Sequence, residues 1–183
     1  GIDAMTGATP LANFKIAVAN GTFQPLDFQD ALFNLFIGNV GGCIGETSAV
    51  ALLLGAIILW YKRIIGFRIP LVYIGIVFIL YWLFNDTGAL FTSSALVVPF
   101  YQILSGGLFL GAIFMATDMV TSPITPKGKI FFAAGCGILT FLIRKFGGYP
   151  EGVSYSILIM NLFVPLIERY SRPKIYGEVK KSD

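Results

Sequence analysis

Five long apolar runs, separated by short polar loops, constrain the fold of this chain more than any other feature. The runs cover residues 46–61, 70–84, 101–119, 130–143 and 153–167. Only 13% of the residues are charged, against about 25% in soluble domains. Lipid offers the backbone no hydrogen-bond partners, so apolar spans of this kind form helices. The sequence therefore predicts an all-α, polytopic membrane protein with about five transmembrane helices.

Several runs are shorter than a straight membrane span requires. A run near 15 residues extends about 22 Å as a helix, whereas a straight span takes about 20 residues. Either flanking small residues lengthen the helices, or glycines break them at Gly41–Gly42 and at Ser105–Gly107. We favour breaks in the first and third runs. Such half-helices are typical of inverted repeats, and we expect this chain to be one half of one.

The polar segments divide the chain into three parts. Residues 1–43 combine a small-residue loop with an amphipathic segment, residues 44–167 form the helix bundle, and residues 168–183 form a charged tail. The amphipathic segment places its apolar side chains at helical spacing, namely Phe28, Leu32, Leu35 and Phe36.

Lysine and arginine predict the orientation. With five spans, the basic loops 62–69 and 121–129 and the basic tail fall on one side, which is the cytoplasmic side by the positive-inside rule. The N-terminal loop then lies outside the inner membrane. Arg144 and Lys145 are the exception, since this scheme places them on the outer side.

Several classes of function are excluded by composition. The sequence has no histidine, which removes His-ligated haem and catalysis that uses a histidine base. Its two cysteines cannot hold an iron–sulfur cluster alone, because such a cluster needs about four ligands. The net charge of +3 is gathered in the loops and tail, where it fits membrane orientation rather than nucleic-acid binding.

The N-terminal loop carries the chain's clearest chemical motif. Asp3 is followed by Thr6, Gly7, Ala8 and Thr9, and a proline comes next. This spacing predicts a tight loop with an exposed hydroxyl at its end. The small residues would let a large enzyme approach the backbone, and Asp3 could polarise the hydroxyl or help to hold a metal ion. The alternative is an ordinary turn in which Thr9 caps a helix.

Three further polar residues lie in or beside the apolar runs. Glu46 either lies in the first turn of a helix, where the positive end of the dipole stabilises an acid, or lines a cofactor or ion path. Asp118 stands at a helix C-terminal end, where an anion is disfavoured, and serves either a turn with Thr121 or a functional site. Asn161 lies within a span and either links helices by a hydrogen bond or belongs to a site.

Several segments resemble the RnfD/NqrB family, whose members are flavin-carrying membrane subunits of ion-pumping oxidoreductases. The similar segments are residues 42–49, 106–107, 114–118, 120–128, 147–152, 161–166 and 172–177. Residues 147–152 and 172–177 look more like RnfD, the subunit of the Rnf ion-translocating electron transport complex, than like NqrB. Family members carry further N-terminal helices, so the chain looks like a C-terminal half.

The resemblance implies a flavin site and a set of partners. Residues 3–9 match the family's flavinylation motif, in which a flavin transferase takes FMN from FAD, releasing AMP, and joins the FMN phosphate to the hydroxyl of the last threonine, here Thr9. Electrons passing through this FMN would drive Na⁺ or H⁺ across the membrane, with Glu46, Asp118 and Asn161 as coupling or second-flavin residues. A noncovalent riboflavin and a second covalent-flavin subunit are also implied. The rival hypothesis is a broken-helix transporter or channel with no redox role.

Overall fold

A computed structural model describes residues 9–20, 27–42, 47–84, 93–149 and 151–171 of the chain. The described residues are helical and contain no strand, so the all-α prediction is confirmed for this part of the chain. The elements are α1 (Pro10–Ala19), α2 (Asp27–Ile37), α3 (Ala49–Tyr61), α4 (Arg68–Leu83), α5 (Ser93–Leu104), α6 (Leu108–Leu110), a π-helical turn η1 (Gly111–Met115), α7 (Pro126–Phe146) and α8 (Val153–Ser171).

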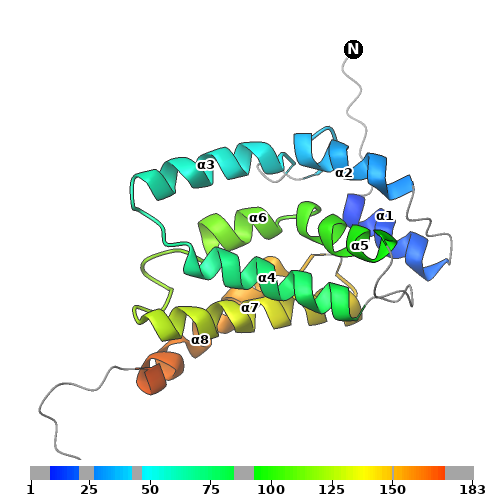
Figure 1. Ribbon diagram of the computed structural model, residues 1–183. Helices are drawn as coiled ribbons and strands as arrows, with labels where there is room; N and C mark the ends of the chain where they lie inside the picture. The colour runs from blue at the N-terminus through cyan, green and yellow to red at the C-terminus, as the bar shows by residue number, and fades with distance from the viewer. Residues whose placement is uncertain (1–8, 21–26, 43–46, 85–92, 150, 172–183) are drawn as a thin grey trace, which may run out of the picture.

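Helices α4 and α7 form the centre of the bundle (Figure 1). Helix α8 packs against α7, and α5 packs against α4. Helix α2 lies on α5, and α3 runs beside α6 at the edge of the molecule (Figure 1). Helix α3 begins after Ser48, whose Oγ accepts a hydrogen bond from the Ala51 amide at 3.3 Å, which is a standard N-cap.

The core lies where α4 meets α7. Tyr73 and Val77 of α4 and Phe132 and Cys136 of α7 are fully buried. Burying a valine or phenylalanine side chain stabilises a fold by about 1.5–3 kcal/mol. Gly137 allows this close approach, because a Cβ there would lie 2.9 Å from Ile76 Cγ2 and 3.2 Å from the Tyr73 carbonyl oxygen.

Three buried hydroxyl groups tie α4, α7 and α8 together. The Tyr73 hydroxyl lies 2.6 Å from Thr140 Oγ1 and 2.8 Å from Ser156 Oγ. Thr140 and Ser156 also lie 2.8 Å apart, and Ser156 donates to the Val153 carbonyl at 2.7 Å. Each hydroxyl finds a partner within the apolar core, so the three helices are held in one register without an unsatisfied hydroxyl among them.

The predicted break in the third apolar run is confirmed. Helix α5 ends at Leu104 and α6 begins at Leu108, and the two arms Leu96–Leu104 and Leu108–Met115 meet at a bend of 67°. Within the described ranges, this bent pair alone satisfies, by length and composition, the requirement for a membrane span, and no single helix does so. The apolar helices α3 and α4 are shorter than that requirement.

Two boundaries differ from the sequence-based expectation. Residues 93–100 belong to α5, although the third apolar run begins only at residue 101, because Val97 and Val98 are buried and the helix accommodates Pro99. Helix α8 continues through Pro165 to Ser171, beyond the apolar run that ends at residue 167. A proline removes a single amide donor, and the residues on both sides of Pro165 remain helical. The division into three domains stays a prediction.

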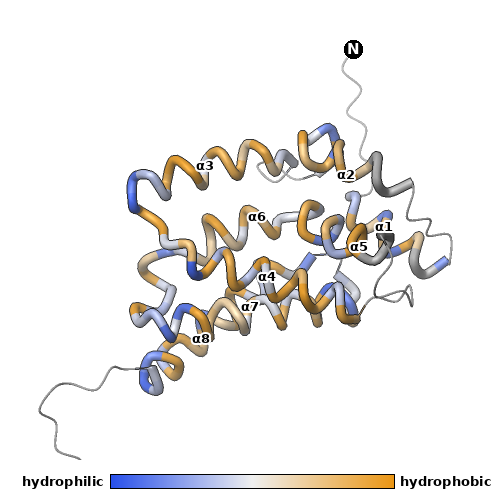
Figure 2. The backbone as a smooth tube through the Cα atoms, viewed as in Figure 1, coloured by the Kyte–Doolittle hydropathy of each residue, from blue (hydrophilic) through white to orange (hydrophobic). Residues whose placement is uncertain are grey.

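The amphipathic segment forms α2, as expected, and its apolar side chains differ in exposure. Leu35 is buried and Leu32 is half-buried, whereas Phe36 is exposed. Gly41 and Gly42 lie in the coil after α2 rather than inside a bent helix pair. The backbone of α3 and α4 is coloured mostly as hydrophobic, and hydrophilic residues gather in the loop between them (Figure 2).

Candidate functional site

Thr9 immediately precedes α1 and caps it. Its Oγ1 accepts a hydrogen bond from the Ala12 amide at 3.4 Å, and its carbonyl accepts one from the Asn13 amide at 3.0 Å. Pro10 takes the first helical position, where its missing amide costs nothing. The Thr9 hydroxyl therefore stands at the N-terminal end of a helix. Because Thr9 is half-buried, it remains partly accessible.

Helix α1 is held against the bundle at several points. Leu11 and Phe14 are buried. The Tyr101 hydroxyl of α5 donates to the Pro10 carbonyl at 2.9 Å, and the Tyr101 ring stacks on Phe14 with the centroids 5.3 Å apart. On another side, Lys15 Nζ donates to the carbonyls of Gly147 and Tyr149, in the loop after α7. Helix α1 is therefore attached to α5 near its Thr9 end, through Pro10, and to the α7–α8 loop further along, through Lys15.

Arg144 of α7 fills the break after α5. The side chain is 4% exposed. Its Nη1 donates to the Gln102 carbonyl at 2.5 Å and lies 3.4 Å from Gln102 Oε1, while Nη2 donates to the Ser105 carbonyl at 3.4 Å. The last carbonyls of a helix have no intrahelical donor and carry partial negative charge. A buried guanidinium at this position satisfies them and is itself stabilised.

Three separate segments converge on Gly106 within the break. Gly106 has a φ of +71°, in the left-handed region that favours glycine. A Cβ at Gly106 would lie 3.2 Å from Arg144 Nη2, 3.4 Å from Glu151 Oε1 and 3.5 Å from Leu11 Cδ2. The end of α7, the following loop and the start of α1 therefore meet at the break, and Leu11 lies two residues from Thr9.

Sequence reasoning did not identify Arg144 as a site residue. The sequence feature that pointed to it is that Arg144 departs from the positive-inside pattern. A cation that caps a broken helix inside the bundle satisfies carbonyl groups rather than marking a loop as cytoplasmic. Lys145 beside it is half-exposed and donates to the Phe84 carbonyl at 2.9 Å.

Asp118 and Asn161 are not among the residues that meet at this break. Asp118 is exposed, and Thr121 Oγ1 donates to its Oδ2 at 3.1 Å, which is the turn contact, one of the two alternatives considered for Asp118. Asn161 lies on α8, and its buried Oδ1 receives no hydrogen bond from the described residues. The coupling or second-flavin roles of both residues stay predictions.

Five other predicted site residues lie outside the described part of the chain. They are Asp3, Thr6, Gly7, Ala8 and Glu46.

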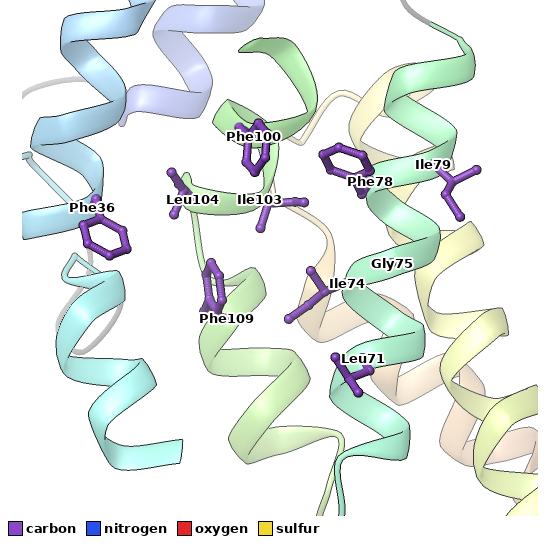
Figure 3. A pocket seen from close by; sticks show the side chains of 10 residues that line it. All are labelled: Phe36, Leu71, Ile74, Gly75, Phe78, Ile79, Phe100, Ile103, Leu104 and Phe109. Atoms are coloured by element: carbon purple, nitrogen blue, oxygen red, sulfur yellow. The ribbon is translucent and has the colours of Figure 1, made fainter. Parts of the chain in front are cut away.

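An apolar pocket of about 660 Å³ lies between α2, α4, α5 and α6 (Figure 3). Its lining residues are Phe36, Leu71, Ile74, Gly75, Phe78, Ile79, Phe100, Ile103, Leu104 and Phe109. Cofactor sites combine apolar walls with a few placed polar groups that fix the ligand's orientation. These ten side chains supply no such group, so the walls fit a hydrocarbon better than the ring of a noncovalent riboflavin.

Comparison with known proteins identifies the family. The profile of the NQR2, RnfD, RnfE family matches residues 1–177. The chain belongs to this family. Among similar proteins is the subunit named D in a proton-translocating ferredoxin:NAD(+) oxidoreductase complex from Clostridium ljungdahlii, which is 48% identical over 97% of this chain. The corresponding subunit of a Na(+)-translocating complex from Acetobacterium woodii is 46% identical over 97% of this chain. The expected family resemblance is therefore confirmed.

The chain spans about half the length of the curated relatives it matches. The aligned part covers 53% of the Clostridium ljungdahlii protein and 51% of the Acetobacterium woodii protein. The corresponding subunit of an ion-translocating oxidoreductase complex from Stutzerimonas stutzeri is 42% identical, over 96% of this chain and 49% of its own length. The names of the first two relatives assign them different ions, so similarity at this level does not select Na⁺ or H⁺ for this family member.

Proposed function

We propose that this chain is part of the flavin-carrying membrane subunit of an ion-translocating ferredoxin:NAD⁺ oxidoreductase complex. Electrons pass through FMN that is joined to Thr9 by a phosphodiester. The observation that carries the proposal is the position of Thr9, whose hydroxyl stands at the N-terminal end of α1 and closes the motif of residues 3–9. The names of the relatives supply the class of complex.

The environment of Thr9 fits a phosphate ester. The amides of a helix's first turn have no intrahelical acceptor, and the helix dipole favours negative charge at that end. Phosphate groups bind at helix N-termini for both reasons. The half-buried side chain of Thr9 also leaves room for a flavin transferase to reach the hydroxyl. The N-cap contact and esterification are compatible, because the phosphate oxygens can take over as acceptors for the first-turn amides.

The division of labour between chain and cofactor follows from the chemistry of flavins. FMN supplies the ability to accept and donate electrons. The protein supplies position, and α1, α5 and the loop after α7 provide it through the contacts of Pro10, Phe14 and Lys15. The coupling of electron flow to Na⁺ or H⁺ movement belongs to the complete complex. A second, noncovalent flavin remains an additional proposal.

Apolar surface on the described helices supports a membrane location and contacts with other subunits. Leu158, Leu162 and Leu166 of α8 are each at least half exposed. Contiguous exposed apolar surface of this kind marks contact with lipid or another protein. We propose that the chain lies in the inner membrane with Thr9 outside and the C-terminus in the cytoplasm, and that its partners include a second covalent-flavin subunit.

Gel fluorescence of variants tests the proposal. In cells with an active flavin transferase, the wild-type chain should give a fluorescent band on a denaturing gel. Thr9→Val should abolish the fluorescence, because it removes the nucleophilic hydroxyl while keeping the branched shape. Thr6→Ala serves as the control and should keep the flavin. A fluorescent Thr9→Val band would refute the assignment, and a colourless wild-type chain would favour the broken-helix transporter with no redox role.

A further inference from the structure

We propose that Arg144 is a positioning residue for the segment that carries Thr9. By closing the break after α5, Arg144 fixes the surfaces against which α1 rests and so determines where the Thr9 end of α1 lies. The position of α1 does not depend on a cofactor. The effect of that position on a bound flavin rests on the function proposed above.

Arg144 of α7 contacts the last turn of α5. The guanidinium reaches the carbonyls of Gln102 and Ser105, which lie on the last turn of α5 and at the break. Arginine presents several N–H donors in a rigid planar fork, whereas lysine presents a single ammonium group. Because the side chain is buried, water does not replace these donors readily, and losing them leaves polar groups unsatisfied.

Helix α1 rests on both segments that Arg144 joins. From α5, Tyr101 holds Pro10 by a hydrogen bond and Phe14 by ring stacking. From the end of α7, the carbonyls of Gly147 and Tyr149 accept hydrogen bonds from Lys15. Tyr101 immediately precedes Gln102, and Gly147 lies three residues after Arg144. Both attachments of α1 are therefore next to the residues that the guanidinium connects.

Leu11 of α1 covers the break between α5 and α6. Leu11 Cδ2, Arg144 Nη2 and Glu151 Oε1 all lie within 3.5 Å of the position that a Gly106 Cβ would take. Leu11 is 3% exposed. A change in the conformation of the break would displace the Leu11 side chain, and Thr9 lies two residues before it.

The test compares three variants of the intact, purified complex. Arg144→Gln removes the charge and the fork, and Arg144→Lys keeps the charge but loses the fork. Lys145→Gln is the matched control, because it removes the neighbouring positive charge of the same helix without touching the break. Two properties are measured for each variant, namely amide hydrogen exchange in peptides that cover Pro10–Ala19 and the midpoint potential of the flavin on Thr9.

The expected result is a graded effect confined to Arg144. In Arg144→Gln, the amide hydrogens of α1 should exchange about tenfold faster than in the wild type. Charge-assisted hydrogen bonds shift a local opening equilibrium by about that factor. This variant should also shift the flavin midpoint potential, since the surroundings of the flavin change. Arg144→Lys should restore part of both properties, and Lys145→Gln should match the wild type. Unchanged exchange in Arg144→Gln, or an equal effect of Lys145→Gln, would overturn the proposal.

If Arg144→Gln does not accumulate, Arg144→Lys carries the test of Arg144, and a fourth variant tests the contact of α1 with α5. Tyr101→Phe removes the hydroxyl that donates to Pro10 and leaves Arg144 and the ring stack in place. It should also accelerate exchange in α1, and wild-type exchange in this variant would count against the proposal. Gel fluorescence separates the two claims. If the wild-type chain carries no flavin, the proposed function fails, while exchange in α1 still decides the role of Arg144.

Discussion

Tyr73 shows what a single polar atom contributes inside this bundle. Its hydroxyl bonds to Thr140 and Ser156 at the junction of three helices. We expect Tyr73→Phe to destabilise the fold by about 1 kcal/mol, because one buried hydrogen-bond partner is lost while Thr140 and Ser156 still bond to each other. For a chain of this size, the thermal midpoint should fall by about 2–4 °C.

The control for this change is Tyr149→Phe. Tyr149 is 65% exposed, so removing its hydroxyl should leave the midpoint unchanged. Thermal unfolding in detergent, followed by circular dichroism, measures both variants. Equal midpoints for the two variants would show that the hydroxyl cluster contributes nothing to stability.

Thr9 illustrates how much one residue's role could be predicted from the sequence. The motif of residues 3–9 predicted an exposed hydroxyl at the end of a tight loop, and the alternative was a helix N-cap. The structure gives Thr9 the N-cap geometry, and the same geometry favours a phosphate. The contacts of Arg144 could not be predicted in this way, because they join residues 39–42 positions apart and no local pattern encodes them.

At the level of elements, the close contact of α4 and α7 depends on Gly137. A Cβ at Gly137 would meet Ile76 and the Tyr73 carbonyl, whereas a Cβ at Gly75 would meet nothing within 4 Å. Both glycines lie within helices. We expect Gly137→Ala to lower stability by about 1–3 kcal/mol through overpacking. Gly75→Ala should be neutral or stabilising, because alanine favours helix by about 1 kcal/mol over glycine.

The comparison of these two alanine variants is decisive because both gain the same helix propensity. Thermal midpoints measured under identical conditions should separate them, with Gly137→Ala lower. If Gly137→Ala were as stable as Gly75→Ala, the α4–α7 contact would be looser than the structure indicates.

The elements themselves were largely predictable, and their ends were not. The apolar runs predicted helices, and Ser105–Gly107 predicted the break between α5 and α6. The apolar run at residues 101–119 does not predict the start of α5 at Ser93, because the burial of Val97 and Val98 arises from tertiary packing. The end of α8 at Ser171 was missed for a different reason, since its last residues lie past the apolar run, in the charged segment that begins at Glu168.

At the level of the whole molecule, the basic loops predict which side of the membrane each end occupies. In a background without Cys43 and Cys136, we expect an impermeant thiol reagent to modify Ala8→Cys in intact cells and to spare Ser182→Cys. The reason is that lysine- and arginine-rich loops stay cytoplasmic. After the cells are opened, both positions should react, which controls for accessibility. Modification of Ser182→Cys alone in intact cells would reverse the predicted orientation.

The exposed apolar surface and the length of the chain both bear on its partners. Exposed apolar side chains lie on α3, α4 and α8, and the chain covers about half of each relative's length. Sequence patterns identify such faces as apolar but do not distinguish lipid from a neighbouring protein. The partners of the complex could therefore be inferred only from the family resemblance.

Peptide mass spectrometry tests the central claim most directly. The chain is purified from cells that contain a flavin transferase, digested, and searched for the peptide that includes Thr9. The proposed function predicts that this peptide carries the added mass of one FMN less one water, with fragment ions that place the group on Thr9 rather than Thr6. An unmodified Thr9 peptide, recovered in full from a chain whose complex transfers electrons, would contradict the account.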